Sequence, residues 1–133
     1  MSEITILANA DQLDKVQAFI EERMEYAGFT SHFQNEISLV VEEVFVNIAN
    51  YAYETEGIAT IRCTAENTYI SMEFLDNGRP YNPLANRDPD ITLSAKERAL
   101  GGLGIFIVKN IMDEVRYRRE NGQNILSMRK SVK

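Results

Sequence analysis

Apolar residues recur at helical spacing from residue 31 to about residue 53, and this stretch predicts the longest helix of the chain. Ser31 with Gln34 three residues later has the pattern of a capping box, which predicts where the helix begins. The apolar positions of the stripe are Phe33, Ile37, Val40, Val44, Ile48 and Tyr51.

Two polar residues interrupt the edge of this stripe. At about 100° per residue, Asn47 falls inside the edge and Glu43, one turn earlier, lies about 40° further out on the same side. Burying an amide beside a carboxylate costs free energy unless a partner compensates. The pair therefore indicates a cleft that holds a cation, a water or a ligand. The alternative is an ordinary surface pair four residues apart.

The rest of the chain contains further helical and strand-like patterns. Helices and hairpins occur in separate runs and not in alternating parallel units, so we expect a two-layer α/β sandwich with a largely antiparallel sheet. Gly28 is the expected end of the first helix. The predicted elements are strand 4–7, helix 11–27, strands 59–64 and 70–74, a buried helix 103–112, and a hairpin of strands 115–119 and 124–128.

Composition narrows the classes of protein. The 133 residues are 44% hydrophobic and 26% charged, which fits one compact domain over residues 1–133. The net charge of -6 argues against nonspecific binding to nucleic acid or to an acidic membrane, although a local anion site is still compatible with it. The one cysteine, Cys63, is expected to be a core thiol. No membrane span or signal peptide is recognisable, so we expect a cytoplasmic protein.

Two loops carry candidate chemistry. Asp76 directly follows a predicted strand and precedes Asn77 and Gly78, so a carboxylate at the end of the sheet could accept a hydrogen bond from an exocyclic amine. A plain turn is the alternative. Residues 101–104 bring three glycines to the start of the last helix, where backbone amides and the helix dipole favour a phosphate. The alternative there is a flexible glycine turn.

The three motifs in this order resemble those of the GHKL superfamily of ATP-binding domains, which gyrases, heat-shock chaperones, mismatch-repair proteins and histidine kinases share. Glu43 to Asn47 matches the N box, Asp76 to Gly78 the first glycine box, and Gly101 to Gly104 the second. The closer resemblance is to bacterial anti-sigma-factor serine kinases, and it covers nearly the whole chain. It implies a Bergerat-type sandwich in which a mixed, largely antiparallel sheet carries three main helices on one face.

The resemblance also implies the cofactors ATP and Mg²⁺ and a role for each motif. Asn47 would coordinate Mg²⁺, and Glu43 would act as general base on an incoming serine hydroxyl or orient it. Asp76 would bind the adenine amino group, and Gly78 would leave room for the base. The other expected nucleotide contacts are Gly101, Gly102, Leu103 and Gly104, and Arg98 from a lid over residues 84–100. Lys96 and Arg87 of the same segment are interpreted as solvated charges.

The chain departs from this family pattern at two positions. Tyr51 stands where relatives often have histidine, which matters little if the position only packs. Gln123 follows Gly122 in place of the usual threonine, so a hydrogen bond close to the site is expected to be changed or lost. The only histidine, His32, lies in the first turn of the long helix and is expected to be solvated or to pack.

The leading hypothesis is an ATP- and Mg²⁺-dependent serine-protein kinase that sequesters a sigma factor and phosphorylates a small antagonist of that sequestration. A homodimer would be usual for such a protein, whereas direct nucleic-acid and membrane contacts are not expected. The alternative from another class is a nucleotide-gated protein-binding module in which no phosphate moves. An ATPase fragment of a larger machine is disfavoured because the chain has no transducer domain.

Overall fold

In the part of the chain that the structure describes, five strands form a single antiparallel sheet in the order β1-β2-β3-β5-β4. The computed structural model describes residues 1–85 and 103–132. Every predicted strand is confirmed, and each is somewhat longer than the pattern indicated. The strands are β1 Ser2–Leu7, β2 Ile58–Glu66, β3 Tyr69–Asp76, β4 Glu114–Glu120 and β5 Gln123–Ser131.

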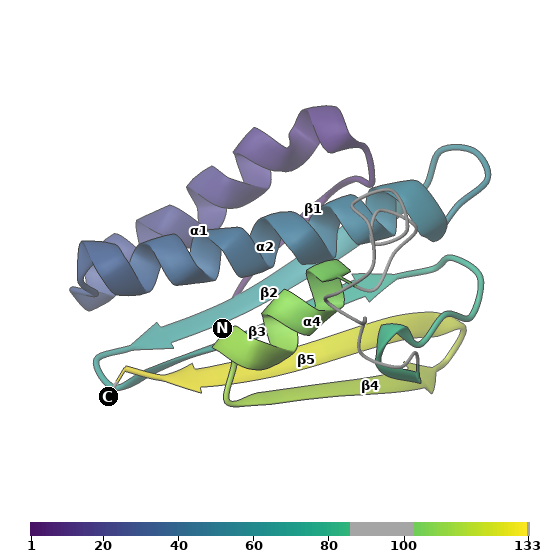
Figure 1. Ribbon diagram of the computed structural model, residues 1–133. Coiled ribbons are helices and arrows are strands. Elements are labelled where there is room, and N and C mark those ends of the chain that lie inside the picture. Colours follow the sequence, from purple (N-terminus) through teal and green to yellow (C-terminus); the bar gives the residue numbers. More distant parts are fainter. Residues whose placement is uncertain (86–102, 133) are drawn as a thin grey trace.

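Within the described residues, three α-helices lie on one face of the sheet (Figure 1). They are α1 Leu13–Ala27, α2 Ser31–Tyr51 and α4 Leu103–Ile111. Short 3-10 turns at Ala10–Gln12 and Pro83–Ala85 precede α1 and follow β3. The expected two-layer α/β sandwich is therefore confirmed. Within the described residues, no helix has both the length and the apolar character needed to cross a membrane.

The end of α1 agrees with the sequence prediction, whereas the start of α2 differs from it. Gly28 adopts a left-handed conformation with φ of 79° and ends α1 as expected. The capping residue of α2 is Thr30 and not Ser31, because the Thr30 hydroxyl accepts the Phe33 N–H at 3.2 Å. Gln34 instead donates to the carbonyl of Phe29 at 3.0 Å, and the third residue after Thr30 is Phe33, so the predicted capping box is wrong.

The core fills the space between the helices and one face of the sheet. The inward positions of β2, β3 and β5 pack against α1 and α2, and the thiol of Cys63 is buried among them as expected. Helix α4 differs from its prediction. Among its side chains whose burial is described, only Val108 is fully buried and most others are half-buried. The fully buried large side chains are Phe45, Phe74, Ile20, Met24, Ile37, Ile61, Ile70, Met72, Val16, Val40, Val41 and Val108.

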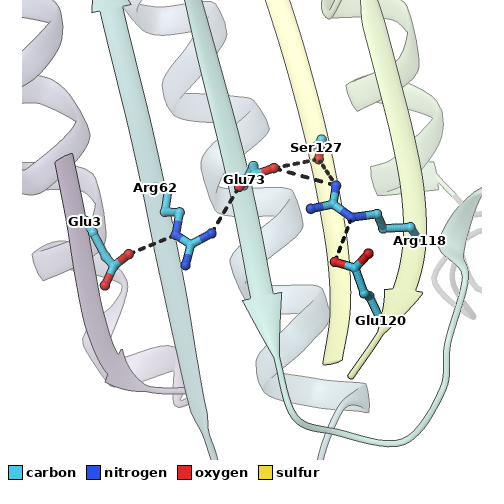
Figure 2. Close-up of polar contacts among 6 residues, drawn as sticks. All are labelled: Glu3, Arg62, Glu73, Arg118, Glu120 and Ser127. Atoms are coloured by element: carbon cyan, nitrogen blue, oxygen red, sulfur yellow. Dashed lines mark hydrogen bonds and ion pairs between the residues drawn. The ribbon is translucent and has the colours of Figure 1, made fainter. Parts of the chain in front are cut away.

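The other face of the sheet carries a row of charged and hydroxyl side chains that crosses all five strands (Figure 2). Arg62 pairs with Glu3 at 2.8 Å and with Glu73 at 3.5 Å. Arg118 of β4 pairs with the second carboxylate oxygen of Glu73 at 3.7 Å. Because opposite charges alternate along this row, the helix-free face is polar and internally paired.

Candidate functional site

Asn47 and Asp76, which are predicted to bind one ligand, line the same small cavity. Asn47 projects from the last third of α2, and Asp76 is the final residue of β3. The cavity holds about 30 Å³, and its other walls are mainly apolar side chains of α2 and its end, of the strands β3, β4 and β5, and of the loop after β3. Small-molecule pockets usually measure roughly 300–1,000 Å³. A nucleotide base would therefore have to displace wall residues, of which Tyr81 is the most exposed.

The carboxylate of Asp76 is buried, with 6% of the residue exposed, and it is held in a fixed orientation. Its Oδ1 accepts two hydrogen bonds, one from the Gly78 N–H and one from the side-chain amide of Asn124, both at 2.9 Å. Within the described residues, no donor reaches Oδ2. The geometry thus leaves one carboxylate oxygen able to accept a hydrogen bond from a ligand.

Asn124 is a site residue that the sequence analysis missed. It lies directly opposite Asp76 in the register of β3 and β5, and it is the other buried polar residue of the described chain. Its amide nitrogen donates to Asp76 and to the carbonyl of Arg79 at 2.8 Å. Its Oδ1 accepts the Tyr117 hydroxyl at 2.6 Å, Arg119 at 3.1 Å and the Tyr81 N–H at 3.2 Å. The residue after Gln123 thus donates a hydrogen bond to Asp76, while the change expected from Gln123 itself remains a prediction.

The loop after Asp76 packs against the end of α2. A Cβ at Gly78 would overlap the backbone of Ala52, so this position admits only glycine without a shift of the backbone. The Arg79 N–H donates to the Ala52 carbonyl at 3.0 Å, and Arg119 donates to the Gly78 carbonyl at 2.8 Å. Close packing explains Gly78 by itself, and the room it would leave for a base remains a prediction.

Glu43 faces the first turn of α4. A Cβ at Gly104 would overlap the Oε2 of Glu43, so the glycine allows the carboxylate to approach the start of this helix. Burial raises the pKa of Glu43 above its ordinary value of 4.5, and the neighbouring charge of Glu42 raises it further. A carboxyl group with a raised pKa has increased affinity for a proton, which suits a general base.

Several predicted contacts lie outside the described residues. These are Arg98, Gly101 and Gly102, together with the solvated charges expected at Lys96 and Arg87. Leu103 and Gly104 are the first two residues of α4, where the second glycine box was expected to open a helix.

His32 and Tyr51 of the long helix lie where the sequence analysis expects them, in solvated or packing positions. The side chain of His32 is 88% exposed, and its nearest carboxylate is that of Glu36 at 4.0 Å. It is therefore solvated and takes no part in the site. Tyr51 packs its ring against that of Tyr81, with a centroid distance of 6.2 Å, which agrees with a packing role.

A larger groove of about 440 Å³ lies between the end of α1 and the edge of the sheet. Its cysteine, Cys63, is buried, and burial raises the pKa of the thiol to about 11, so the thiolate that a nucleophile needs is not formed near neutrality. Its arginine, Arg23, donates to the Phe19 carbonyl at 2.8 Å and pairs with Glu22 at 2.9 Å. Neither residue gives the larger groove a reactive group, so the smaller cavity is the candidate functional site.

The metal-binding capacity of the site is limited. Within the ranges 1–85 and 103–132, no group of three or more His, Cys, Asp or Glu side chains is arranged to hold a metal ion. The Asn47 side chain makes no hydrogen bond to another described residue, so its amide oxygen is available. Mg²⁺ often binds through one or two protein ligands together with waters and substrate phosphates. Asn47 fits that kind of site.

Comparison with known proteins identifies the family of the chain. The family described as histidine kinase-like ATPase domain matches residues 6–130. Among curated relatives, the serine/threonine-protein kinase BtrW of Bordetella bronchiseptica is 28% identical over 94 residues, which are 69% of this chain and 66% of that protein. The serine-protein kinase RsbW of Halalkalibacterium halodurans is 23% identical over 132 residues, which are 96% of this chain and 81% of that protein.

Solved structures share the fold. The RsbU and RsbW domains of a Mycobacterium tuberculosis protein superpose with a TM-score of 0.63 at 12% identity, over 98% of this chain and 32% of that one. The histidine kinase domain of a blue-light activated histidine kinase from Erythrobacter litoralis gives a TM-score of 0.54 at 16% identity, over 92% of this chain and 60% of that one. At these identities the likeness concerns the fold alone.

Proposed function

The chain belongs to the histidine kinase-like ATPase domain family, and from this premise we propose that it is an ATP- and Mg²⁺-dependent serine-protein kinase that acts as an anti-sigma factor. Its substrate is a small antagonist protein with an accepting serine. Relatives named serine-protein kinase, matched at 22–28% identity, support the kinase part of the proposal.

The observation that carries the proposal is the placement of Glu43 and Asn47 one turn apart on α2. Asn47 faces the cavity of Asp76, while Glu43 contacts the start of α4. The base end and the reactive end of a nucleotide would then be held along one helix. This arrangement also puts the Glu43 carboxylate next to the N-terminus of α4, where a phosphate would bind.

The residues present suit a phosphoryl transfer. Mg²⁺, held by the amide oxygen of Asn47 and by the phosphates, would neutralise charge on the transferring group. Glu43 accepts the proton of the serine hydroxyl while the serine oxygen forms its bond to the γ-phosphorus. The bond from that phosphorus to the β,γ-bridging oxygen breaks, and ADP leaves. Asp76 keeps the base in place throughout.

The transfer would drive a partner switch. The unphosphorylated antagonist binds this protein and frees the sigma factor. A phosphate on the serine adds about -1.5 to -2 charges and ends that binding, so the sigma factor is captured again.

Transfer of labelled γ-phosphate from Mg²⁺-ATP to small antagonist-like proteins of the same source tests the proposal. Glu43→Ala should lower serine labelling by at least about 100-fold and leave ATP binding intact, because a general base contributes roughly 10²–10⁴-fold. Glu42→Ala removes an exposed carboxylate one residue away and is the matched control, which should still label. No labelling by the wild type with ATP binding intact would favour the nucleotide-gated binding module.

A further inference from the structure

Helix α2 ends without a cap of its own. Helix α1 ends at Gly28, whose left-handed conformation turns the chain back toward the last carbonyls of that helix. The residue after α2 is Ala52, which keeps right-handed helical angles, and the last turn of α2 contains no basic residue. Because the last carbonyls of a helix have no partner within it, those of α2 need donors from elsewhere in the chain.

Arg79 supplies two such donors from the loop after β3. Its Nε donates to the carbonyl of Tyr51 at 2.9 Å, and its backbone N–H donates to the carbonyl of Ala52 at 3.0 Å. Arg79 and Tyr51 are 28 residues apart in the chain, so this cap is a tertiary contact. A cation at the C-terminal end of a helix also interacts favourably with the helix dipole. Arg79 therefore caps α2 with both its side chain and its backbone.

The residues on either side of Arg79 keep the loop against the end of the helix. Gly78 lies so close to the backbone of Ala52 that a Cβ would overlap it. The ring of Tyr81 packs against the ring of Tyr51. Arg79 itself is exposed, so its side chain can be replaced without opening the core.

The turn that Arg79 caps is the turn that begins at Asn47. In an α-helix each N–H donates to the carbonyl four residues earlier, which pairs the N–H of Tyr51 with the carbonyl of Asn47. The side chain of Asn47 lines the cavity of Asp76. When the last turn of a helix opens, the backbone before it loses hydrogen bonds, and the side chains on that backbone are held less firmly.

We infer that Arg79 is a positioning residue that closes the last turn of α2 and thereby holds Asn47 in place for the metal-bound nucleotide. The inference rests on the proposed function in that it takes Asn47 as the residue that meets Mg²⁺. Arg79 touches neither the metal nor the nucleotide in this scheme and acts through the helix. It joins the loop after Asp76, at the base end of the site, to the helix that carries the reactive end.

Amide hydrogen exchange in Arg79→Met and Arg79→Lys tests the cap without any ligand. Methionine keeps an unbranched side chain but cannot donate, whereas lysine keeps a charge and a donor. The amides of Tyr51 and Ala52 should exchange about fivefold faster in Arg79→Met than in the wild type, which is about 1 kcal/mol. Arg79→Lys should stay within about twofold of the wild type. Unchanged exchange in Arg79→Met would overturn the inference.

The affinity for ATP with and without Mg²⁺ tests the consequence for the site. Arg79→Met should bind Mg²⁺-ATP about fivefold more weakly than the wild type does, which is about 1 kcal/mol. In excess EDTA it should bind ATP within about twofold of the wild type, because only the metal-bound complex uses Asn47. Arg116→Met is the matched control and should change neither affinity, since it removes an exposed arginine that pairs with Glu114 at 3.1 Å.

The outcomes separate the inference from the proposed function. An equal loss of affinity with and without Mg²⁺ in Arg79→Met would mean that the arginine supports the loop in general, and would overturn the inference. A wild type that binds no ATP, or binds it equally well with and without Mg²⁺, would instead contradict the proposed function.

Discussion

At the scale of single residues, Glu43 is placed at a cost to stability. Its carboxylate lies in a half-buried position against Gly104 and next to Glu42, and both burial and that neighbour raise its pKa. The folded protein therefore holds the Glu43 proton more tightly than the unfolded chain does. Stability must fall as pH rises from the ordinary pKa of 4.5 through the raised one, and above it the whole penalty is present.

Glu43→Gln removes this penalty and the proposed general base together. The variant should melt about 1–3 °C above the wild type at pH 7 and at nearly the same temperature near pH 4, where the wild-type carboxyl is already neutral. Calorimetric Tm values between pH 4 and pH 8 measure the difference, and the same sample should show no phosphate transfer. A variant that is less stable than the wild type at pH 7 would contradict this account of Glu43.

Asn124 shows where prediction from sequence fails at this scale. Asn47 was singled out because a polar residue interrupts an apolar stripe, and Asn124 does the same on the inward face of its strand beside Leu126 and Met128. The signal was present but weaker, since a strand end tolerates polar residues. Its partner Asp76 is 48 residues away, and the pairing depends on the register of β3 and β5, which no local pattern specifies.

At the scale of elements, the loop after β3 is held on two sides. Its backbone bonds to the end of α2 through Arg79 and to the β4–β5 hairpin through Arg119 and Asn124. The Tyr53 hydroxyl accepts the Asn77 N–H at 2.7 Å and adds a contact from the chain after α2. The loop that follows the base-binding carboxylate is thus positioned by three separate elements.

Gly78→Ala tests the contact with α2. The added methyl group would overlap the backbone of Ala52, which cannot move as a flexible side chain does, so we expect a loss of about 1–3 kcal/mol in the free energy of unfolding. Urea denaturation measures it. Asn77→Ala changes the exposed neighbouring residue and should stay within about 0.5 kcal/mol of the wild type. Equal stabilities for the two variants would mean that the loop does not need this close approach.

Arg119→Gln tests the contact with the hairpin. Arg119 donates to the Gly78 carbonyl and to Asn124 Oδ1, so its loss should weaken ATP binding by about tenfold, as expected for a hydrogen-bonded charged group. Arg118→Gln is the matched control. That residue lies in the charged row on the open face of the sheet (Figure 2), where exposed pairs are worth roughly 0–1 kcal/mol.

Calorimetric titration with ATP distinguishes the two arginines. Only the Arg119 variant should lose affinity, while the Arg118 variant should bind as the wild type does. If both variants bound ATP equally well, the hairpin would have no part in holding the site.

At the scale of the whole molecule, the sequence predicts the architecture better than the site. Helical stripes, period-two strands and the turn at Asn121 and Gly122, whose φ values are 54° and 78°, lead to the observed two layers. Helix α4 is expected to be buried because it is apolar almost all round, yet among its side chains whose burial is described only Val108 is fully buried. Burial depends on what packs over an element, and periodicity does not carry that information.

The charged row on the open face of the sheet could not be predicted from local sequence patterns either. Glu3, Arg62 and Glu73 are far apart in the chain and meet only because three strands pair in register. Such pairs make the uncovered face of the sheet compatible with water on one side and leave the chemistry to the helical side. The organisation of the molecule thus places the buried carboxylate of Asp76 at one end of the α2 and β3 interface.

Equilibrium binding of ATP to the wild type and to Asp76→Asn is the most direct test of the central claim that this cavity is a nucleotide site. The asparagine would keep its oxygen for the Gly78 N–H and the Asn124 amide and so turn a donor toward the ligand. We predict at least a tenfold loss of affinity with the fold retained, and no loss in Glu73→Gln, which changes a carboxylate of the same strand on the opposite face. Undiminished ATP binding by a folded Asp76→Asn variant would contradict the account.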